Sequence, residues 1–315
     1  MTLPQKPIVV VGSINLDLVA TTPQIPLPGQ TLTGTDFATT PGGKGANQAV
    51  AVARLGYPVH MVGMVGDDVF GEALLKNLDR AGVGTEAIAR VDGASGVALI
   101  AVSASGENSI IVVPGANGKV TPAFIDQHAD LIHSAGMVLC QLELPMEAVS
   151  RTLALCAQGG IPVMLDPAPA AALPDAVWNQ LAWFTPNTSE AALYLEKNFA
   201  PEDAAKRLLT RGVGGVVLKR GAEGAYVAVA SGKANWVRPF SVETVDTVAA
   251  GDCFNGAFAV GLLEGQDLWE AARFASAAAA ISVTQHGAQA SMPTRPEVTA
   301  FLARNSPEAT KDIIA

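Results

Sequence analysis

The sequence contains little cysteine. Its 315 residues include three cysteines, Cys140, Cys156 and Cys253, and no two of them stand at the spacing of a metal-binding motif. An odd and widely spaced set gives little support to a disulfide framework or to a structural zinc site. We therefore expect a protein of a reducing compartment, the cytoplasm.

The sequence also lacks a long apolar run. Its first apolar segment, Ile8 to Ile14, is too short for the hydrophobic region of a signal peptide, and no uninterrupted apolar stretch reaches the roughly 18 residues of a membrane span. There is no internal repeat, low-complexity tract or linker rich in proline, glycine or serine. We expect one domain over residues 1–315, with neither membrane insertion nor export.

Charge is scarce and unbalanced. Charged residues make up 16% of the chain and the formal net charge is −9, while 49% of the residues are hydrophobic. This composition indicates a well-buried globule rather than a disordered chain. No cluster of lysine or arginine offsets the negative charge, which excludes nucleic acid as a partner. A phosphorylated ligand would have to be held locally, by helix N-termini, a few lysines or a metal ion.

The sequence does contain an alternation of short apolar strands with helical windows. A β-branched strand at Ile8 to Ile14 is followed by a helix over about 44–55, a strand, and a helix that runs from about Phe70 to a stop at Gly82. The alternation continues to two Ala-rich helical windows at 253–263 and 268–283. This order predicts an α/β fold, with a doubly wound, mostly parallel central sheet flanked by helices.

Several polar residues follow the predicted strands. Ligands of doubly wound sheets bind beyond the carboxyl ends of the strands. One crevice is therefore expected to collect Asn15, Glu143, Asp166, Asn187 and Lys219 to Gly221.

Two segments do not follow the alternation. Residues 17–40 contain several prolines and threonines and a Pro-Gly turn, and residues 95–117 alternate apolar and polar side chains around a Gly-Glu-Asn turn. Both patterns predict short antiparallel strands. We expect residues of about 16–40 and 95–113 to form a small β-sheet appended to the main domain.

The segment "PGGKGANQAV", residues 41–50, has two interpretations. It is not a P-loop, because that motif requires Ser or Thr after its Gly-Lys and here Lys44 is followed by Gly45. It is either a glycine turn that leads into an Ala-rich helix or a ligand site. In the second case the glycines let a ligand approach the backbone, and Asn47 reaches back toward it from the first helical turn.

The segment "DTVAAGDCFNGAF", Asp246 to Phe258, contains the strongest candidate for chemistry. A helix N-terminus entered through Ala249, Ala250 and Gly251 would expose backbone N–H groups, which suits the charge of a transferring phosphoryl group. Asp252 beside it would be ionised at neutral pH and able to accept a proton from a sugar hydroxyl. Taken alone, Asp252 is more simply explained as an ordinary N-cap.

Together these motifs resemble the ribokinase family of sugar kinases, over about residues 8–304. The matching segments, in order, are "GSINLD", "PGGKGANQAVAVARLG", "VGDDVFG", "QLELP", "LDPAPA", "TPNTSE", "DTVAAGDCFNGAF" and "HGAQAS". The resemblance implies a kinase that transfers the γ-phosphoryl group of ATP to the 5-hydroxyl of D-ribose, with Mg²⁺ and an activating K⁺ as cofactors.

The resemblance also implies roles for individual residues. Asp252 would be the general base, and the backbone of Ala249, Ala250 and Gly251 would be the anion hole. The positions that match ribose contacts are Asn15, Asp17, Gly43, Lys44, Asn47 and Glu143, together with Asp252. Those that match nucleotide contacts are Asn187 and Glu190, which would organise Mg²⁺ and the phosphates, and Lys219, Arg220, Gly221, Gly224, Gly251 and Ser276.

Asp246 would be a ligand of K⁺, and a cation held there would rigidify the anion hole. The other ligands implied are the carbonyls of Val248, Ser282, Gln285 and Gly287 and the side chain of Ser291. From the residues alone, Asp246 is also explained as a loop aspartate that bonds its own backbone.

The sugar and the assembly remain expectations. A deoxy sugar would leave Asp17 unpaired if this residue accepts hydrogen bonds from vicinal hydroxyls, which favours ribose over 2-deoxyribose. A kinase for 2-deoxyribose, another pentose or a nucleoside is the alternative within the same chemistry, and a non-catalytic sugar-binding protein is the alternative outside it. The two β-rich segments resemble the family's lid, which implies a homodimer.

Overall fold

The computed structural model describes residues 5–195 and 199–306. Within this part of the chain, nine strands form the central sheet. They are β1 (Ile8–Val11), β4 (Val59–Gly66), β5 (Gly84–Val91), β8 (Met137–Cys140), β9 (Val163–Leu165), β10 (Trp183–Phe184), β11 (Gly215–Lys219), β12 (Ala225–Val229) and β13 (Ala234–Val237). Their spatial order is β13-β12-β11-β10-β9-β8-β1-β4-β5. The strands from β11 to β5 pair in parallel, and β12 and β13 add an antiparallel edge.

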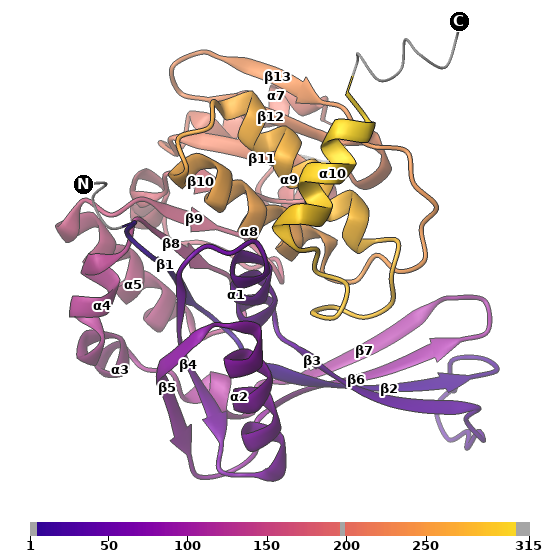
Figure 1. Cartoon of the computed structure of the whole chain (residues 1–315). Coiled ribbons are helices and arrows are strands. Elements are labelled where there is room, and N and C mark those ends of the chain that lie inside the picture. Colours follow the sequence, from indigo (N-terminus) through magenta and orange to yellow (C-terminus); the bar gives the residue numbers. More distant parts are fainter. Residues whose placement is uncertain (1–4, 196–198, 307–315) are drawn as a thin grey trace, which may run out of the picture.

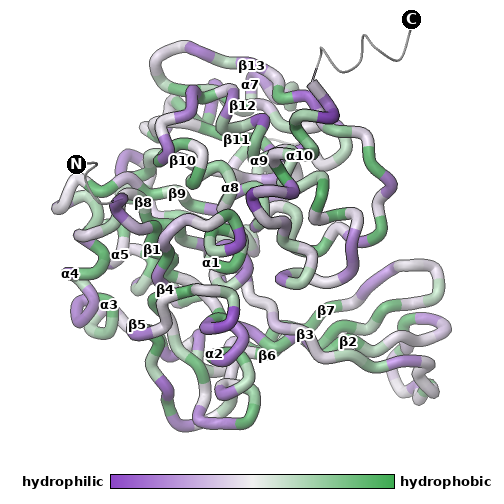
Figure 2. The backbone as a smooth tube through the Cα atoms, viewed as in Figure 1, coloured by the Kyte–Doolittle hydropathy of each residue, from purple (hydrophilic) through white to green (hydrophobic). Residues whose placement is uncertain are grey.

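The central strands are buried on both faces, as their β-branched sequences predict. In β1, Ile8 and Val10 pack into one hydrophobic core, while Val9 and Val11 pack into another on the opposite face. Figure 2 shows the corresponding hydrophobic colouring along the middle of the molecule. The sheet is therefore the middle layer of three.

Helices cover both faces of the sheet (Figure 1). The first core is closed by α1 (Lys44–Arg54), α2 (Val69–Ala81), α8 (Ala250–Leu263), α9 (Leu268–Ser282) and α10 (Arg295–Arg304). The second is closed by α3 (Pro122–Gln127), α4 (Ala129–Ser134), α5 (Met146–Gly159), α6 (Thr188–Tyr194) and α7 (Pro201–Leu209). Three 3-10 turns, η1 (Gly115–Lys119), η2 (Asp175–Gln180) and η3 (Gly221–Glu223), complete the described elements. No helix among the described residues combines the length and apolar character that a membrane crossing requires.

A second, four-stranded sheet projects from the body of the molecule (Figure 1). Its strands are β2 (Asn15–Thr22), β3 (Asp36–Gly42), β6 (Gly96–Ser103) and β7 (Asn108–Val113), in the order β3-β2-β6-β7. Each of the two β-rich segments forms the antiparallel hairpin that its sequence predicts. The two hairpins join through a parallel pair, β2 with β6, because both strands run outward from the body of the molecule.

Candidate active site

The candidate active site lies beyond the carboxyl ends of the parallel strands. The turn after β1 contributes Ser13, whose hydroxyl donates to Glu143 Oε2 from the segment after β8. The backbone N–H of Lys44 donates to the same oxygen at 3.1 Å. Further along the sheet, Lys219 Nζ at the end of β11 pairs with Asp166 Oδ1 after β9 at 2.9 Å. Of the residues expected to share one crevice, the structure thus joins Asp166 to Lys219 and places Glu143 beside the start of α1.

The glycines before α1 let this helix lie against the end of β1. A Cβ atom on Gly45 would stand 2.7 Å from the backbone of Gly12, and one on Gly43, where φ is +87°, would stand 2.7 Å from the nitrogen of Asn15. A Cβ on Gly42 would stand 2.3 Å from the Asp17 carboxylate. The space left by the missing side chains is therefore filled by the chain itself, and the close approach sets the position of α1.

Asp252 lies in the first turn of α8. The helix begins at Ala250, and Ala249 occupies the N-cap position with a φ of 59° and a ψ of 11°. The interpretation of Asp252 as the N-cap is therefore wrong, because Ala249 holds that position and Asp252 is the third residue of the helix. Its carboxylate accepts hydrogen bonds from Asn47 Nδ2 at 3.0 Å and Gln48 Nε2 at 3.1 Å, both on α1.

Burial governs the protonation of Asp252, which is 4% exposed. Burial raises the pKa of Asp252 to about 6, although the positive charge of Lys44 opposes this and the negative charge of Asp166 adds to it. A carboxylate with this pKa is mostly ionised at neutral pH and is a stronger base than an exposed aspartate.

The start of α8 presents backbone N–H groups beside this carboxylate. The N–H of Ala250 donates to the carbonyl of Thr247 at 3.3 Å. Those of Gly251 and Asp252 fall in the first turn, where an α-helix offers no acceptor of its own. A Cβ on Gly251 would stand 3.3 Å from Lys219 Nζ, so the lysine lies over the same turn. The arrangement suits a negatively charged group.

Asp17 and Lys44, two of the residues expected to contact a sugar, have shifted pKa values. Burial raises the pKa of Asp17 to about 7, helped by the negative charges of Glu143 and Asp252. For Lys44, burial acts downward, but the surrounding carboxylates, Asp252 first among them, raise its pKa overall. Asn15 is held by Asn117, whose Nδ2 donates to Asn15 Oδ1 at 2.7 Å.

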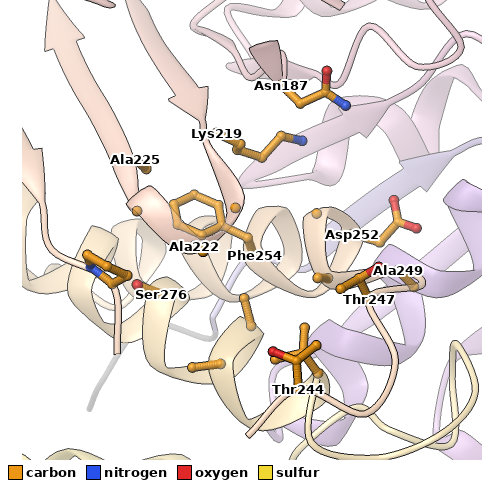
Figure 3. Close-up of a pocket in the computed structure, with 18 of the residues that line it drawn as sticks. Asn187, Lys219, Ala222, Ala225, Thr244, Thr247, Ala249, Asp252, Phe254 and Ser276 are labelled. Atoms are coloured by element: carbon orange, nitrogen blue, oxygen red, sulfur yellow. The ribbon is translucent and has the colours of Figure 1, made fainter. Parts of the chain in front are cut away.

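A pocket of about 700 Å³ adjoins the start of α8 (Figure 3). Asp252, Ala249 and Thr247 stand at one end, and Ser276 and Ala225 at the other. The expected nucleotide-side residues that line it are Asn187, Glu190, Lys219, Gly221, Gly224, Gly251 and Ser276. Arg220 is not in this lining; its guanidinium pairs with Glu223 at 2.6 Å. The structure also places Thr244 and Phe254 in the pocket wall, and the sequence offered no signal for either.

Asn187 and Glu190 form a capping box at the start of α6. Asn187 Oδ1 accepts from the Glu190 N–H at 2.8 Å, and Glu190 Oε2 accepts from the Asn187 N–H at 2.7 Å. Burial raises the pKa of Glu190, while Lys219 acts in the opposite direction. The box fixes both side chains at the edge of the pocket.

Asp246 links two loops. Its Oδ1 accepts from the Val248 N–H and its Oδ2 from the Gly287 N–H, each at 3.0 Å. The backbone N–H of Gln285 donates to the Ser282 carbonyl at 3.3 Å, and Ser291 is buried with its hydroxyl on the Ala288 carbonyl. The carboxylate therefore ties the loop before α8 to the loop after α9.

Three glutamines that were not predicted as site residues complete the site. Gln48 donates to Asp252, Gln141 Nε2 donates to Gln48 Oε1 at 2.8 Å, and Gln289 Nε2 donates to Asn47 Oδ1 at 3.2 Å. Gln48 lies 93 residues from Gln141, and Asn47 lies 242 residues from Gln289. Only the fold brings these side chains together.

Comparisons with known proteins agree on one family. Residues 5–295 match the model of the pfkB family carbohydrate kinases. The chain is 44% identical to the ribokinase of Bacillus subtilis strain 168 over 300 residues, which covers 94% of this chain and 99% of that protein. It is similar to the crystal structure of ribokinase from Thermotoga maritima, with a TM-score of 0.87, 39% identity and coverage of 94% and 99% of the two chains. It is also similar to Arabidopsis thaliana ribokinase complexed with ribose and ATP, with a TM-score of 0.88, 33% identity and coverage of 94% and 98%.

Proposed function

Because the chain belongs to the pfkB family of carbohydrate kinases, we propose that it transfers the γ-phosphoryl group of ATP to the 5-hydroxyl of D-ribose. It is a phosphotransferase with an alcohol acceptor. The observation that carries the proposal is the buried carboxylate of Asp252 beside the N-terminus of α8, at the edge of a pocket large enough for a nucleotide.

The geometry supports a direct transfer. Asp252 accepts the proton of the sugar hydroxyl while the hydroxyl oxygen attacks the γ-phosphorus. The bond from the γ-phosphorus to its bridging oxygen breaks, and ADP leaves. The N–H groups at the start of α8, with Lys219 over the same turn, stabilise the negative charge of the transferring group.

The sugar side is assigned to the turn after β1 and the start of α1. Asn15, Asp17, Gly43, Lys44, Asn47 and Glu143 are the proposed ribose contacts. Asp17 gives the preference for ribose, since a 2-deoxy sugar would leave a partly buried carboxylate without its hydroxyl partner, at a cost of up to about 10⁴-fold. The small sheet of β2, β3, β6 and β7 serves as the lid over this sugar. The lid and the main α/β body together form one domain.

The residues at the pocket edge fit Mg²⁺. This ion is usually held by one or two carboxylates together with substrate phosphates, and Glu190 with Asn187 provides one carboxylate and one amide beside the pocket. Among the described residues no cluster of three or more His, Cys, Asp or Glu side chains could hold a metal alone. When bound, the ion would neutralise charge on the phosphates.

The loops joined by Asp246 fit K⁺. The donors proposed, Asp246 with the carbonyls and hydroxyl named above, are all oxygen, which is the chemistry that replaces the hydration shell of this ion. Because Asp246 also fixes the Val248 N–H, a cation held here would stiffen the loop that leads into Ala249 and the anion hole.

The test is an ADP-release assay with Mg²⁺-ATP. Ribose, 2-deoxyribose, fructose and adenosine are compared, each in K⁺ and in Na⁺, with Asp252→Ala as the blank. We expect turnover of ribose that rises in K⁺ and falls by about 10²- to 10⁴-fold in the blank. Preferred turnover of another sugar would overturn the role of Asp17, and ribose binding without any turnover would support the non-catalytic alternative.

The assembly and location belong to the same proposal. We place the protein in the cytoplasm as a homodimer that pairs through the lid. The support is a group of exposed apolar side chains on the two faces of the small sheet, Phe37, Leu99, Ile110, Ile111, Val112 and Val113. Figure 2 shows hydrophobic colouring along β6 and β7. Strand β7 is also an edge strand, with a free side for a partner.

A further inference from the structure

We propose that Gln48 is the positioning residue of the catalytic base: its side-chain amide orients Asp252 and separates it from a second carboxylate, Asp166. This inference rests on the proposed kinase activity and adds a residue to its machinery. Gln48 acts through Asp252, so it positions the base without touching the sugar.

The amide of Gln48 bridges two acids. Its Nε2 donates to Asp252 Oδ1 at 3.1 Å and to Asp166 Oδ2 at 3.2 Å. The primary amide has two N–H donors, so each carboxylate receives one. Gln48, Asp166 and Asp252 are all buried, being 1%, 3% and 4% exposed, so bulk water has little access to this bridge.

Gln141 fixes the orientation of the Gln48 amide. Gln141 Nε2 donates to Gln48 Oε1 at 2.8 Å. A flipped amide on Gln48 would turn its oxygen toward two carboxylates and its NH₂ group toward the Gln141 donor, so only one orientation satisfies all four groups. Gly12 makes room for Gln141, because a Cβ there would stand 2.1 Å from Gln141 Oε1.

The bridge decides the charge state of the pair. Two carboxylates in direct contact tend to share one proton, whereas a neutral amide between them supplies each with a donor. Lys219 compensates Asp166 at 2.9 Å, and Lys44 acts on Asp252 from α1. Asp17 on β2 and the Cys253 thiol on α8 also interact electrostatically with Asp252.

The second oxygen of the base is held in the same way. Asp252 Oδ2 accepts from Asn47, the neighbour of Gln48 on α1. A carboxylate offers about four lone-pair positions, so two remain for the hydroxyl proton of the sugar. Gln48 neither gains nor loses a proton in the transfer.

The decisive variant is Gln48→Met, which keeps the length of the side chain and removes the amide. Loss of a donor to the ionised form raises the pKa of Asp252, so we expect the acid limb of the kcat-pH profile to move up by about one pH unit. At pH 7 kcat should fall about tenfold or more, with KM for ribose and ATP within about threefold of wild type, since ground-state binding is retained. Raising the pH should restore part of the rate.

Two further variants keep the test sharp. Gln158→Met makes the same chemical change at an exposed position on α5 and should leave kcat and the pH profile unchanged. Gln141→Met leaves both acids in contact with Gln48 but frees its amide, so it should shift the profile in the same direction by less. If thermal unfolding shows that Gln48→Met does not fold, Gln141→Met is used in its place.

A measurement without substrate separates this inference from the proposed function. The carboxyl carbon of Asp252 is titrated by ¹³C NMR in the ligand-free protein, and assigned by its loss in Asp252→Asn. An upward shift of the titration in Gln48→Met supports the inference even if wild type turns over no sugar, which would refute only the kinase proposal. An unmoved titration and an unmoved acid limb would overturn the role of Gln48 even in an active ribose kinase.

Discussion

At the scale of single residues, the loop that leads into α8 holds Ala249 in a left-handed backbone conformation, which residues other than glycine disfavour. Ala249 is the one non-glycine position with positive φ among the described residues. A left-handed conformation costs an L-residue about 1–2 kcal/mol. The fold accepts this cost at the point where the chain turns to aim the N–H groups of Gly251 and Asp252, and strain of this kind often marks a functional site.

The strain predicts opposite effects for two substitutions. Ala249→Gly removes about 1–2 kcal/mol of strain but adds about 0.4–1 kcal/mol of chain entropy to the unfolded state, so a small net gain in the free energy of unfolding is expected. Ala249→Val adds a β-branched side chain at positive φ and should lose stability. Urea denaturation measures both; equal stability of the two variants would show that the loop is not strained.

Asp17 predicts how stability depends on pH. Its pKa is raised to about 7 from the usual aspartate value of 3.8, so between these values the folded state binds more protons than the unfolded state. The free energy of unfolding contributed by Asp17 therefore falls as pH rises from about 4 to about 7.

Asp17→Asn removes this dependence, because the amide is neutral at every pH. The ligand-free variant should be more stable than wild type at pH 8 and closer to it at pH 5, as measured by thermal unfolding at the two pH values. Asp36→Asn, at an exposed position on β3, serves as the control. A stability difference between Asp17→Asn and wild type that does not change with pH would contradict the assigned burial.

At the scale of elements, α2 is tied to the lid by one cap. Asp68 Oδ1 accepts from the Gly71 N–H at 2.7 Å and from the Ser95 hydroxyl, and its Oδ2 accepts from the Ser95 N–H at 2.9 Å. Ser95 directly precedes β6. Burial raises the pKa of Asp68, but these hydrogen bonds lower it by more, because they stabilise the ionised carboxylate.

Removing the cap should loosen the lid as well as the helix. Asp68→Ala is expected to lower the free energy of unfolding by about 0.5–2 kcal/mol, the usual cost of losing an N-cap, and to speed hydrogen exchange at the start of β6. Asp79→Ala, in the last turn of α2 where an acid opposes the helix dipole, is the matched control. Unchanged exchange near Ser95 would show that the lid is held by other contacts.

The elements themselves were largely predictable from the sequence. Gly82 ends α2 in a left-handed conformation, and Thr121 caps α3 before Pro122, both as their residue types indicate. The parallel pairing of β2 with β6 was not predictable, because it depends on where two distant hairpins leave the body of the molecule.

Candidate site residues could be predicted where they stand together in one sequence motif. Contacts between distant segments could not be predicted. Asp252 and Lys44 stand in recognisable motifs. The amide network through Gln141 and Gln289 joins positions far apart in the chain. The raised pKa of Asp252 depends on burial, which cannot be inferred from the neighbouring residues in the sequence. Glutamine on a helix is otherwise an unremarkable surface residue.

At the scale of the whole molecule, one face of the lid is left without a partner in the single chain. In a strand, alternate residues point to opposite faces, and Leu18 of β2 pairs with Leu99 of β6, which pairs with Ile111 of β7. This row lies on the face opposite to Asp17, and Leu99 and Ile111 are 44% and 61% exposed. An apolar sheet face of this kind is typical of a surface that another protein covers.

A second copy of the chain is the partner that we expect on this face. Ile111→Lys places a charge in the middle of the row, where its desolvation would oppose association, so the variant should sediment as a monomer at concentrations at which wild type sediments as a dimer. Val69→Lys is the control, because Val69 is 76% exposed at the start of α2 and lies outside the lid. Since the lid would lose its support, ribose KM should rise in Ile111→Lys with less effect on ATP. A monomeric wild type would show that this face does not mediate dimerisation. A dimer that persists in Ile111→Lys would show that the dimer forms through another surface.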